Sequence, residues 1–393
     1  GDVNSCPGDV LSAQLGKTIG STTDQVLYRF TVSGLNATLD RDSHGNLITA
    51  PISASPNAAN PLLFSVNQFN TQAGAVNRVG QLRIAENVSP MPRDRIFFNY
   101  SYFQDAQFSQ VLQSDVHRFT PGFEKTFMDG NASIEFRAPF ATSIDPVVNL
   151  SNGSTNSGNV SWGNVNLTAK FLIYRSSSFA ISTGLQVVAP TARDTILKSD
   201  VTGDVVDGRI SNGATHILPF SGWLYTPNDR FFSQGFLQVD TDANGNGIYA
   251  NNYLIDPSLA PMGSPKRIGT LYDTTNLYTS TSAGYWVYRS DSPDTLVQAW
   301  APVMELHTSN SLEKADFVQR GQFQAGSPNR HVETINMVLG VHTQLRDRRF
   351  ISAAYAFPVS GQADRQFQGE FRLLLNQLFG PINRQTAAGF FGG

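Results

Sequence analysis

Charged and imidazole side chains recur at alternate positions in segments that are rich in strand-forming residues. Because successive side chains of a β-strand point to opposite faces, residues two apart, such as Glu135 and Arg137, share one face. In these segments the ionisable groups gather on the polar face, where they could line a water-filled channel. The set is Arg118, Glu124, Glu135, Arg137, Lys170, Glu305, His307, His342, Glu370 and Arg372.

Two interpretations of this polar face remain open. A ring of charges at a constriction would set the selectivity of a channel for its solutes. The same charges could instead form an internal salt-bridge lattice that braces a nearly filled barrel. Acidic and basic residues are balanced in the set, so the sequence predicts no preference for anions or cations.

The segment 240–246 matches the first half of a calcium-binding loop. Asp240, Asp242 and Asn244 supply oxygen atoms at positions 1, 3 and 5, and Gly245 stands at position 6. Position 12 is Asn251 rather than a bidentate glutamate. A polar turn explains the same residues more simply, so these three are a weak calcium candidate and no other cofactor is expected.

His307 and Ser309 are two residues apart and would share a face, as a base and a nucleophile must in a hydrolase. The sequence offers no partner that would orient the imidazole. Polar residues at the mouth of a barrel strand account for the pair, and we expect no enzymatic activity.

The elements that would position these residues are strands with unmixed faces. In 333–379, three consecutive segments place apolar residues on one parity and polar residues on the other. Segments of nine to fourteen residues suit tilted strands that cross a bilayer. Twelve strands are predicted, at 95–103, 115–127, 131–140, 163–174, 179–190, 213–226, 230–240, 277–289, 295–308, 333–345, 350–358 and 366–379.

The connections between these strands alternate in length. Short ones are expected at 128–130, 175–178, 227–229, 290–294 and 346–349. Long ones are expected at 104–114, 141–162, 191–212, 241–276 and 309–332, while 359–365 is the exception in being short. Outer-membrane barrels have short periplasmic turns and long outer loops, whereas a soluble β-sandwich has no reason to alternate in this way.

Composition agrees with an all-β chain. Only 15% of the 393 residues are charged, against about 25% in ordinary soluble domains. No run of about 18 apolar residues exists, so no transmembrane helix is predicted. A single cysteine excludes an intrachain disulfide, and a formal net charge of −3 gives no basic surface for nucleic acid.

The region 95–379 resembles Gram-negative outer-membrane β-barrels of the porin or transporter-like, phenol-degradation-pathway type. The resemblance is carried by Leu167–Leu185, Pro190-Thr191, Trp223–Tyr225, Glu305-Leu306-His307 and the strands of 333–379. It implies an outer-membrane channel that admits small organic solutes. The last strand is also similar to the assembly signal of such barrels, at Gln366, Gly369, Phe371 and Phe379. That similarity implies membrane lipid and the barrel assembly machinery as partners.

The sequence therefore predicts an antiparallel transmembrane β-barrel of about twelve strands at 95–379. An accessory segment at 1–94 would plug the lumen, lie in the periplasm or contact another subunit, and a glycine-rich tail follows at 380–393. The predicted function is passive diffusion of small solutes across the bacterial outer membrane. A sealed or secreted structural protein is the main alternative and a membrane hydrolase the lesser one, and a homo-oligomer is left open.

Overall fold

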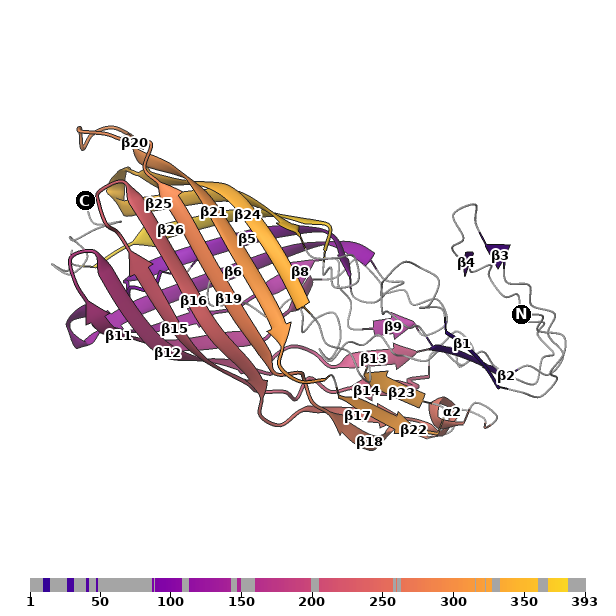
Figure 1. Cartoon of the computed structure of the whole chain (residues 1–393). Helices are drawn as coiled ribbons and strands as arrows, with labels where there is room; N and C mark the ends of the chain where they lie inside the picture. The colour runs from indigo at the N-terminus through magenta and orange to yellow at the C-terminus, as the bar shows by residue number, and fades with distance from the viewer. Residues whose placement is uncertain are drawn as a thin grey trace.

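The computed structural model of this protein consists almost entirely of β-strands. It describes residues 10–14, 27–31, 40–41, 47–48, 87, 89–107, 113–142, 147–149, 160–198, 205–256, 259, 263–314, 316–321, 323–326, 333–359 and 367–380. Figure 1 shows a barrel with smaller β-structures beyond one end. No helix in these described ranges is long and apolar enough to cross a membrane.

Twelve antiparallel strands form the barrel, and the first strand closes it by pairing with the last, from Arg95 opposite Leu378 to Gln104 opposite Gly369. The prediction of a twelve-stranded antiparallel barrel is confirmed. The strands are β5 (Arg95–Gln107), β6 (Gln113–Phe127), β7 (Ala132–Arg137), β11 (Val165–Arg175), β12 (Phe179–Ala189), β15 (His216–Tyr225), β16 (Phe231–Asp242), β19 (Asn276–Tyr285), β21 (Val297–Ser311), β24 (Glu333–Leu345), β25 (Arg349–Pro358) and β26 (Gly369–Leu378).

Two predicted strands are interrupted where the sequence cannot continue a regular ladder. The strand expected at 131–140 ends at Arg137, and β8 (Phe140–Thr142) resumes after Pro139, which has no N–H to donate. The strand expected at 277–289 ends at Tyr285, and the next residue, Trp286, lies inside the barrel and packs against Phe232. Beyond Trp286, β20 (Tyr288–Arg289) pairs with β21.

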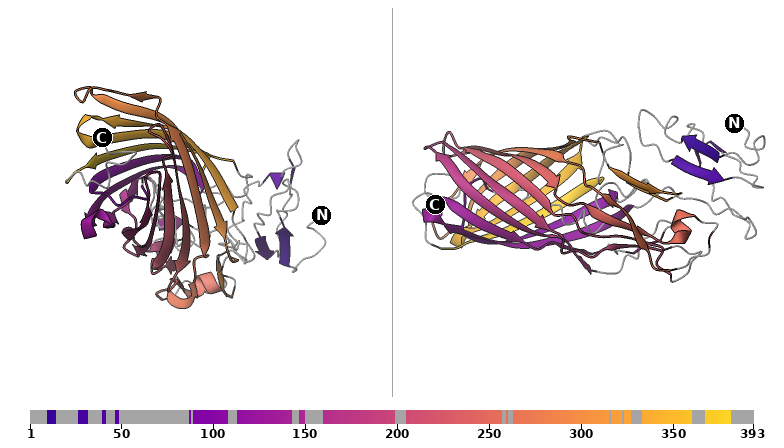
Figure 2. Two further views of the ribbon diagram at one scale, coloured as in Figure 1. Left: turned by 60° about the vertical axis from the view of Figure 1, so that its left-hand side comes forward. Right: turned by 90° about the horizontal axis from the view of Figure 1, so that it is seen from below.

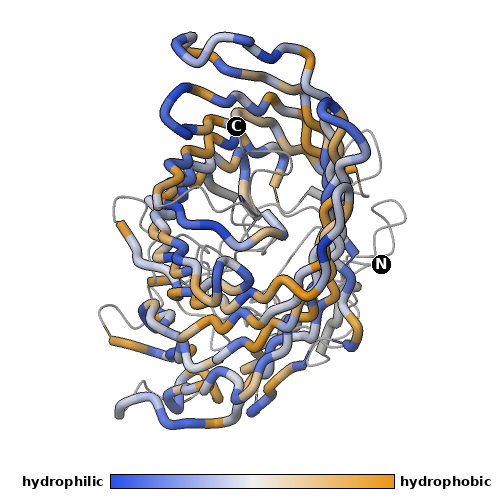
Figure 3. Tube along the Cα trace, turned by 90° about the vertical axis from the view of Figure 1, so that its left-hand side faces the viewer, coloured by the Kyte–Doolittle hydropathy of each residue, from blue (hydrophilic) through white to orange (hydrophobic). Residues whose placement is uncertain are grey.

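Apolar residues cover the outside of the barrel and polar residues fill the inside. On β7, Ile134 and Phe136 are exposed whereas Ser133 and Glu135 are buried. On β11, Leu167 is exposed whereas the neighbouring Thr168 is buried. Figure 3 looks into one end of the barrel and shows hydrophilic and hydrophobic residues alternating along the strands. This arrangement is the reverse of a soluble domain and is what a lipid-facing wall requires.

Short connections gather at one end of the barrel, called the turn end here. They include the 3₁₀ turns η3 (Met128–Gly130) and η4 (Arg346–Arg348), where Asp129 and Asp347 take positive φ values of 54° and 62°. The two ends of the barrel sequence meet at the same place, since the Phe379 amide donates to the Asp94 carbonyl at 3.1 Å. The opposite end is called the loop end.

The long connections at the loop end are not simple loops. Four of them contribute strands to structures that extend beyond the barrel (Figures 1 and 2). Three of these connections build one sheet, called the cap sheet here, whose order is β18-β17-β14-β13-β9. Its strands are β9 (Val147–Asn149), β13 (Thr195–Lys198), β14 (Gly208–Ile210), β17 (Asn246–Ala250) and β18 (Lys266–Leu271), accompanied by α2 (Asn252–Ile255). The fourth connection forms a hairpin of β22 (Phe317–Arg320) and β23 (Phe323–Gly326) that packs against the cap sheet. The strand β10 (Val160–Trp162) belongs instead to the barrel sheet, where it pairs with β8.

The cap sheet has its own hydrophobic core, which the sequence analysis did not predict. Leu197, Ile210, Ile248, Leu271 and Phe323 are buried together there. Each of these residues comes from a different short strand, so no single segment contained a stretch of alternating apolar and polar residues long enough to predict a strand. The N-terminal pairs β1 (Val10–Gln14) with β2 (Leu27–Thr31) and β3 (Asp40–Arg41) with β4 (Leu47–Ile48) are likewise antiparallel.

We expect Leu237→Arg to impair assembly of the barrel far more than Gln234→Arg. Both residues lie on β16, but Leu237 is 50% exposed on the outer surface whereas Gln234 lines the interior. An arginine that faces lipid at mid-depth costs about 2–4 kcal/mol, while polar groups surround the interior position. The measurement is the fraction of heat-modifiable folded protein after refolding into lipid vesicles, and equal yields would contradict the outward assignment.

Candidate functional site

Residues 87 and 89–94, called the lumen segment here, lie inside the barrel just before its first strand. The Asn87 side chain donates to the Asn99 carboxamide oxygen at 2.5 Å and accepts from the Asn376 amide at 2.8 Å. The Arg95 guanidinium donates to the Asn87 carbonyl at 2.6 Å. The lumen segment is therefore attached to both β5 and β26.

Further contacts fix the lumen segment to the opposite strands. The Lys170 ammonium donates to the Ser89 carbonyl at 2.9 Å, and Met91 is buried against Ala180 and Leu224. The segment thus occupies part of the lumen near the turn end. The plug interpretation of residues 1–94 stays a prediction, because most of that range lies outside the described residues, as does the tail beyond Gly380.

Five buried charges form a lattice across β5, β6, β7 and β11. The Glu124 carboxylate accepts from Arg95 Nε at 2.8 Å and from Lys170 Nζ at 3.0 Å. The Glu135 carboxylate accepts from Arg95 Nη2 at 2.7 Å and from Arg137 Nε at 2.5 Å. All five side chains are almost completely buried. Charges removed from water in this way need such partners, because an unpaired buried charge costs several kcal/mol.

A second ion-paired group lies on β26 and β6. Arg372 Nη2 is 2.7 Å from one Glu370 oxygen, and Arg118 Nη2 is 3.9 Å from the other. Seven of the ten residues predicted to line the pore therefore take part in these ion pairs, an arrangement expected of a bracing lattice: Arg118, Glu124, Glu135, Arg137, Lys170, Glu370 and Arg372.

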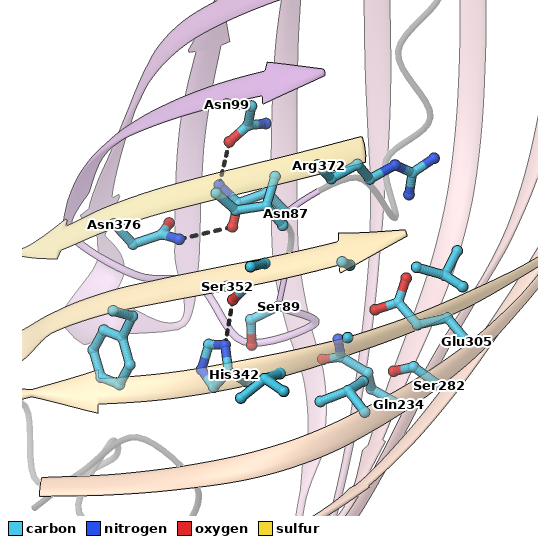
Figure 4. Close-up of a pocket in the computed structure, with 18 of the residues that line it drawn as sticks. Asn87, Ser89, Asn99, Gln234, Ser282, Glu305, His342, Ser352, Arg372 and Asn376 are labelled. Atoms are coloured by element: carbon cyan, nitrogen blue, oxygen red, sulfur yellow. Dashed lines mark hydrogen bonds between the residues drawn. The ribbon is translucent and has the colours of Figure 1, made fainter. Parts of the chain in front are cut away.

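The other side of the lumen contains a cavity of about 120 Å³. Three of the predicted residues, Glu305, His342 and Arg372, line it. The lumen segment forms one wall, and β5, β16, β19, β21, β24, β25 and β26 contribute the others. Figure 4 shows the labelled side chains grouped around this space, with Ser352 hydrogen-bonded to His342 and with Asn87 between Asn99 and Asn376.

Two cavity residues, Arg93 and Arg95, were not among those that the sequence predicted. Arg95 is the first residue of β5 and shares its parity with Asn99 and Ser101, so the alternation of that strand was a signal that could have found it. Arg93 precedes the strand and belongs to no periodic pattern. Only the path of the lumen segment brings Arg93 to the cavity.

His307 has different partners from the one that the sequence suggested. Its Nδ1 is 2.8 Å from Ser280 Oγ, and its Nε2 is 2.9 Å from Glu305 Oε2. Both ring nitrogens are thereby used, so neither is left for Ser309. Ser280 lies directly opposite His307 on β19, a pairing set by strand register that sequence spacing does not show. His307 itself is buried and does not line the cavity.

The residues of the weak calcium candidate are engaged by donors of the protein. Asp242 Oδ1 accepts from the amides of Asn244 and Gly245 at 3.0 and 2.8 Å, which makes a polar turn. Asn244 Oδ1 accepts from the Thr215 amide at 2.8 Å. No group of three or more His, Cys, Asp or Glu residues in the described ranges is arranged to hold a metal ion. The calcium site stays a prediction without further support.

Asp240, the third residue of that candidate, belongs to a network at the loop end. His216 Nδ1 is 2.7 Å from Asp240, and His216 Nε2 is 3.1 Å from Asp273. The Tyr278 hydroxyl also donates to Asp240 at 3.1 Å. Burial raises the pKa of Asp273 to about 6, although its hydrogen bond with His216 acts in the opposite direction. This network ties the connection that follows β18 to the mouth of the barrel.

The sequence matches no protein-family profile and no curated protein. Among solved structures, the COG4313 outer membrane channel from Pseudomonas putida F1 is similar, with a TM-score of 0.47 and 9% identity over 76% of this chain and 100% of that chain. The NanC porin gives 0.40 and 6% over 72% and 100%, and the β domain of the Bordetella autotransporter BrkA gives 0.42 and 11% over 73% and 100%. Such distant likeness decides no function. Membership of the phenol-degradation-pathway type stays a prediction.

Glu124→Gln is expected to lower the free energy of unfolding by about 3–5 kcal/mol, because it leaves the charges of Arg95 and Lys170 buried without their shared carboxylate. The neighbouring Lys125→Gln is the control. The Lys125 side chain is 53% exposed in its pair with Asp94, so its loss should cost at most about 1 kcal/mol. Urea unfolding in lipid vesicles measures both, and equal losses would refute the bracing role of the lattice.

Proposed function

We propose that this chain is an outer-membrane channel through which small solutes diffuse passively. The observation that carries the proposal is a cavity, lined by polar and apolar side chains, inside a closed barrel whose outer surface is apolar. An apolar outer wall fits hydrocarbon, and a polar interior fits water and solutes. A soluble structural protein would gain nothing from exposing so many large apolar side chains.

Exposed aromatic residues near the turn end support the placement in a membrane. Tyr174, Tyr225 and Tyr285 lie at or next to the last residues of β11, β15 and β19, and their rings are exposed. Amphipathic rings at this level form the girdles of outer-membrane barrels. In this proposal the turn end faces the periplasm, the cap sheet faces outward, and the assembly machinery recognises the last strand, β26. Whether the barrel works as a homo-oligomer is left open.

The unequal filling of the lumen indicates where solutes pass. The charge lattice fills the side formed by β5, β6, β7 and β11, and the lumen segment narrows the turn end. The cavity lies between β5, where Arg95 of the lattice borders it, and the remaining strands, and it is lined by both polar and apolar groups. Its volume of about 120 Å³ equals roughly four water molecules, so the solutes in this proposal are small.

We expect the purified full-length protein to give discrete conductance steps in planar bilayers. Vesicles that contain it should swell in small solutes and progressively less in larger ones, because the free part of the lumen is narrow. A sealed structural barrel is the competing explanation. Absence of both conductance and swelling in the full chain, and also in a chain that lacks residues 1–86, would overturn the channel and favour the structural protein. Recovery of conductance only in the shortened chain would identify the N-terminal region as a plug.

A second candidate, a serine hydrolase, is favoured by one specific observation. Ser280, His307 and Glu305 are connected in the order of a nucleophile, a base and an orienting carboxylate, at 2.8 and 2.9 Å. Against it, Ser280 and His307 are buried, and neither lines the cavity. The connected side chains serve equally well as polar filling of the lumen.

A fluorophosphonate probe separates these two explanations of Ser280. Under the channel proposal we expect no labelling of the parent protein, because a buried serine hydroxyl meets no substrate. Labelling that disappears in Ser280→Ala and persists in Ser309→Ala would instead establish the hydrolase. Ser309 is a matched control, because it too is a buried serine and lies two residues from His307 on the same strand.

A further inference from the structure

The cavity in the lumen is lined by two chemically different kinds of side chain. Arg93 of the lumen segment and Arg372 of β26 are cationic. Phe232 of β16 and Phe350 of β25 are aromatic, and aliphatic side chains such as Val303 lie with them in the lining. A solute that fits both kinds must have a polar group and an apolar body.

The charges around the cavity favour an anion. We counted the charged side chains that line the cavity together with those connected to them by ion pairs. In the described part of the chain, this set contains more cations than carboxylates. Six cations face four carboxylates: Arg93, Arg95, Arg118, Arg137, Lys170 and Arg372 against Glu124, Glu135, Glu305 and Glu370. The sequence predicted equal numbers of acidic and basic residues in the lumen, and the addition of Arg93 and Arg95 gives an excess of positive charge. In a site removed from bulk water such an excess attracts an anion strongly.

The aromatic side chains of the lining are held in place by stacked rings. The His342 ring lies 5.7 Å from Phe350 with an interplanar angle of 13°, and it lies 5.8 Å from Trp286. Trp286 in turn lies 5.8 Å from Phe232. These contacts join β16, β24 and β25 into one apolar surface, which is formed before any solute arrives.

We propose that this cavity binds a small organic monocarboxylate, with its carboxylate at Arg93 and Arg372 and its apolar body against Phe232 and Phe350. The planar fork of an arginine matches a carboxylate and can donate two parallel hydrogen bonds. A cavity of about 150 Å³ in another protein takes up benzene, so about 120 Å³ in a partly open site suits a solute of one ring or less. The inference names the solute class of the proposed channel and rests on that proposal for its role in transport.

The test is the binding of benzoate to the full-length protein in lipid vesicles, measured by isothermal titration calorimetry. Benzamide, which has the same ring without the charge, is the matched ligand. We expect saturable binding of benzoate and roughly tenfold weaker binding of benzamide, since a buried charge-assisted contact is lost. No saturable binding of benzoate, or equal binding of the two ligands, would overturn the inference.

Variants locate the binding in this cavity. Arg372→Gln should weaken benzoate binding roughly tenfold, and Arg372→Lys should weaken it less, because the charge remains although the planar fork and its parallel hydrogen bonds are lost. Because Arg372 also pairs with Glu370, Arg93→Gln is the second variant, and it leaves that ion pair intact. Arg349→Gln is the control, since that arginine lies on β25 with its side chain 58% exposed. Unchanged affinity in both Arg372→Gln and Arg93→Gln would refute the assignment.

Conductance measured on the same preparations separates this inference from the channel proposal. Benzoate that binds and also reduces the chloride current supports both. Conductance without binding of benzoate would refute the solute class and leave the channel standing. Binding without conductance or swelling would refute the channel and keep the cavity as a binding site.

Discussion

One carboxylate, that of Glu124, connects four parts of the chain that meet inside the barrel. It accepts from Arg95 of β5, Lys170 of β11 and Ser133 of β7, and from the backbone amide of Arg93 in the lumen segment. In an interior with little water, these donors have no water molecules that could replace the carboxylate as a hydrogen-bond acceptor. The position of the lumen segment, and therefore of the cavity beside it, depends on this single group being charged and buried.

The division of the lumen into a filled side and an open side follows from that constraint. Bulky cations and their carboxylates need one another at hydrogen-bonding distance, so they crowd onto the neighbouring strands β5, β6, β7 and β11. The strands opposite carry smaller inward residues, such as Ser282, Gly340 and Ser352, together with aromatic rings. A barrel of twelve strands has a narrow interior, and an uneven distribution of volume is one way to keep part of it open.

Much of the barrel could be predicted from the sequence because the alternation that defines each strand depends only on residues close together in the chain. Alternation of apolar and polar residues marks a strand whatever its neighbours are, and lengths such as 333–345 were predicted to the residue. The inward direction of Glu135 and Lys170 followed from the same parity. What the sequence could not supply was register. The pairing of His307 with Ser280 across two strands depends on it, whereas spacing along one strand pointed to Ser309.

The features that the sequence did not predict depend mainly on contacts between parts of the chain that are far apart in the sequence. The residues of the cap sheet were expected only as long loops, because none of its strands has more than six residues and its core is complete only when they meet. Pro139 and Trp286 were predicted as members of continuous strands, although Pro139 lacks an N–H to donate to the neighbouring strand. Arg93 reaches the cavity only through the path of the chain before the first strand.

The cap sheet can be completed only after the barrel strands have paired. The strands of the cap sheet and the hairpin of β22 and β23 that packs on it come from four connections that are separated by barrel strands. The buried cluster of Leu197, Ile248 and Phe323 takes its residues from three of them. These apolar residues therefore find one another only where barrel strands in register bring the connections together. A complete cap core requires that the contributing connections all lie at the same end of the closed barrel.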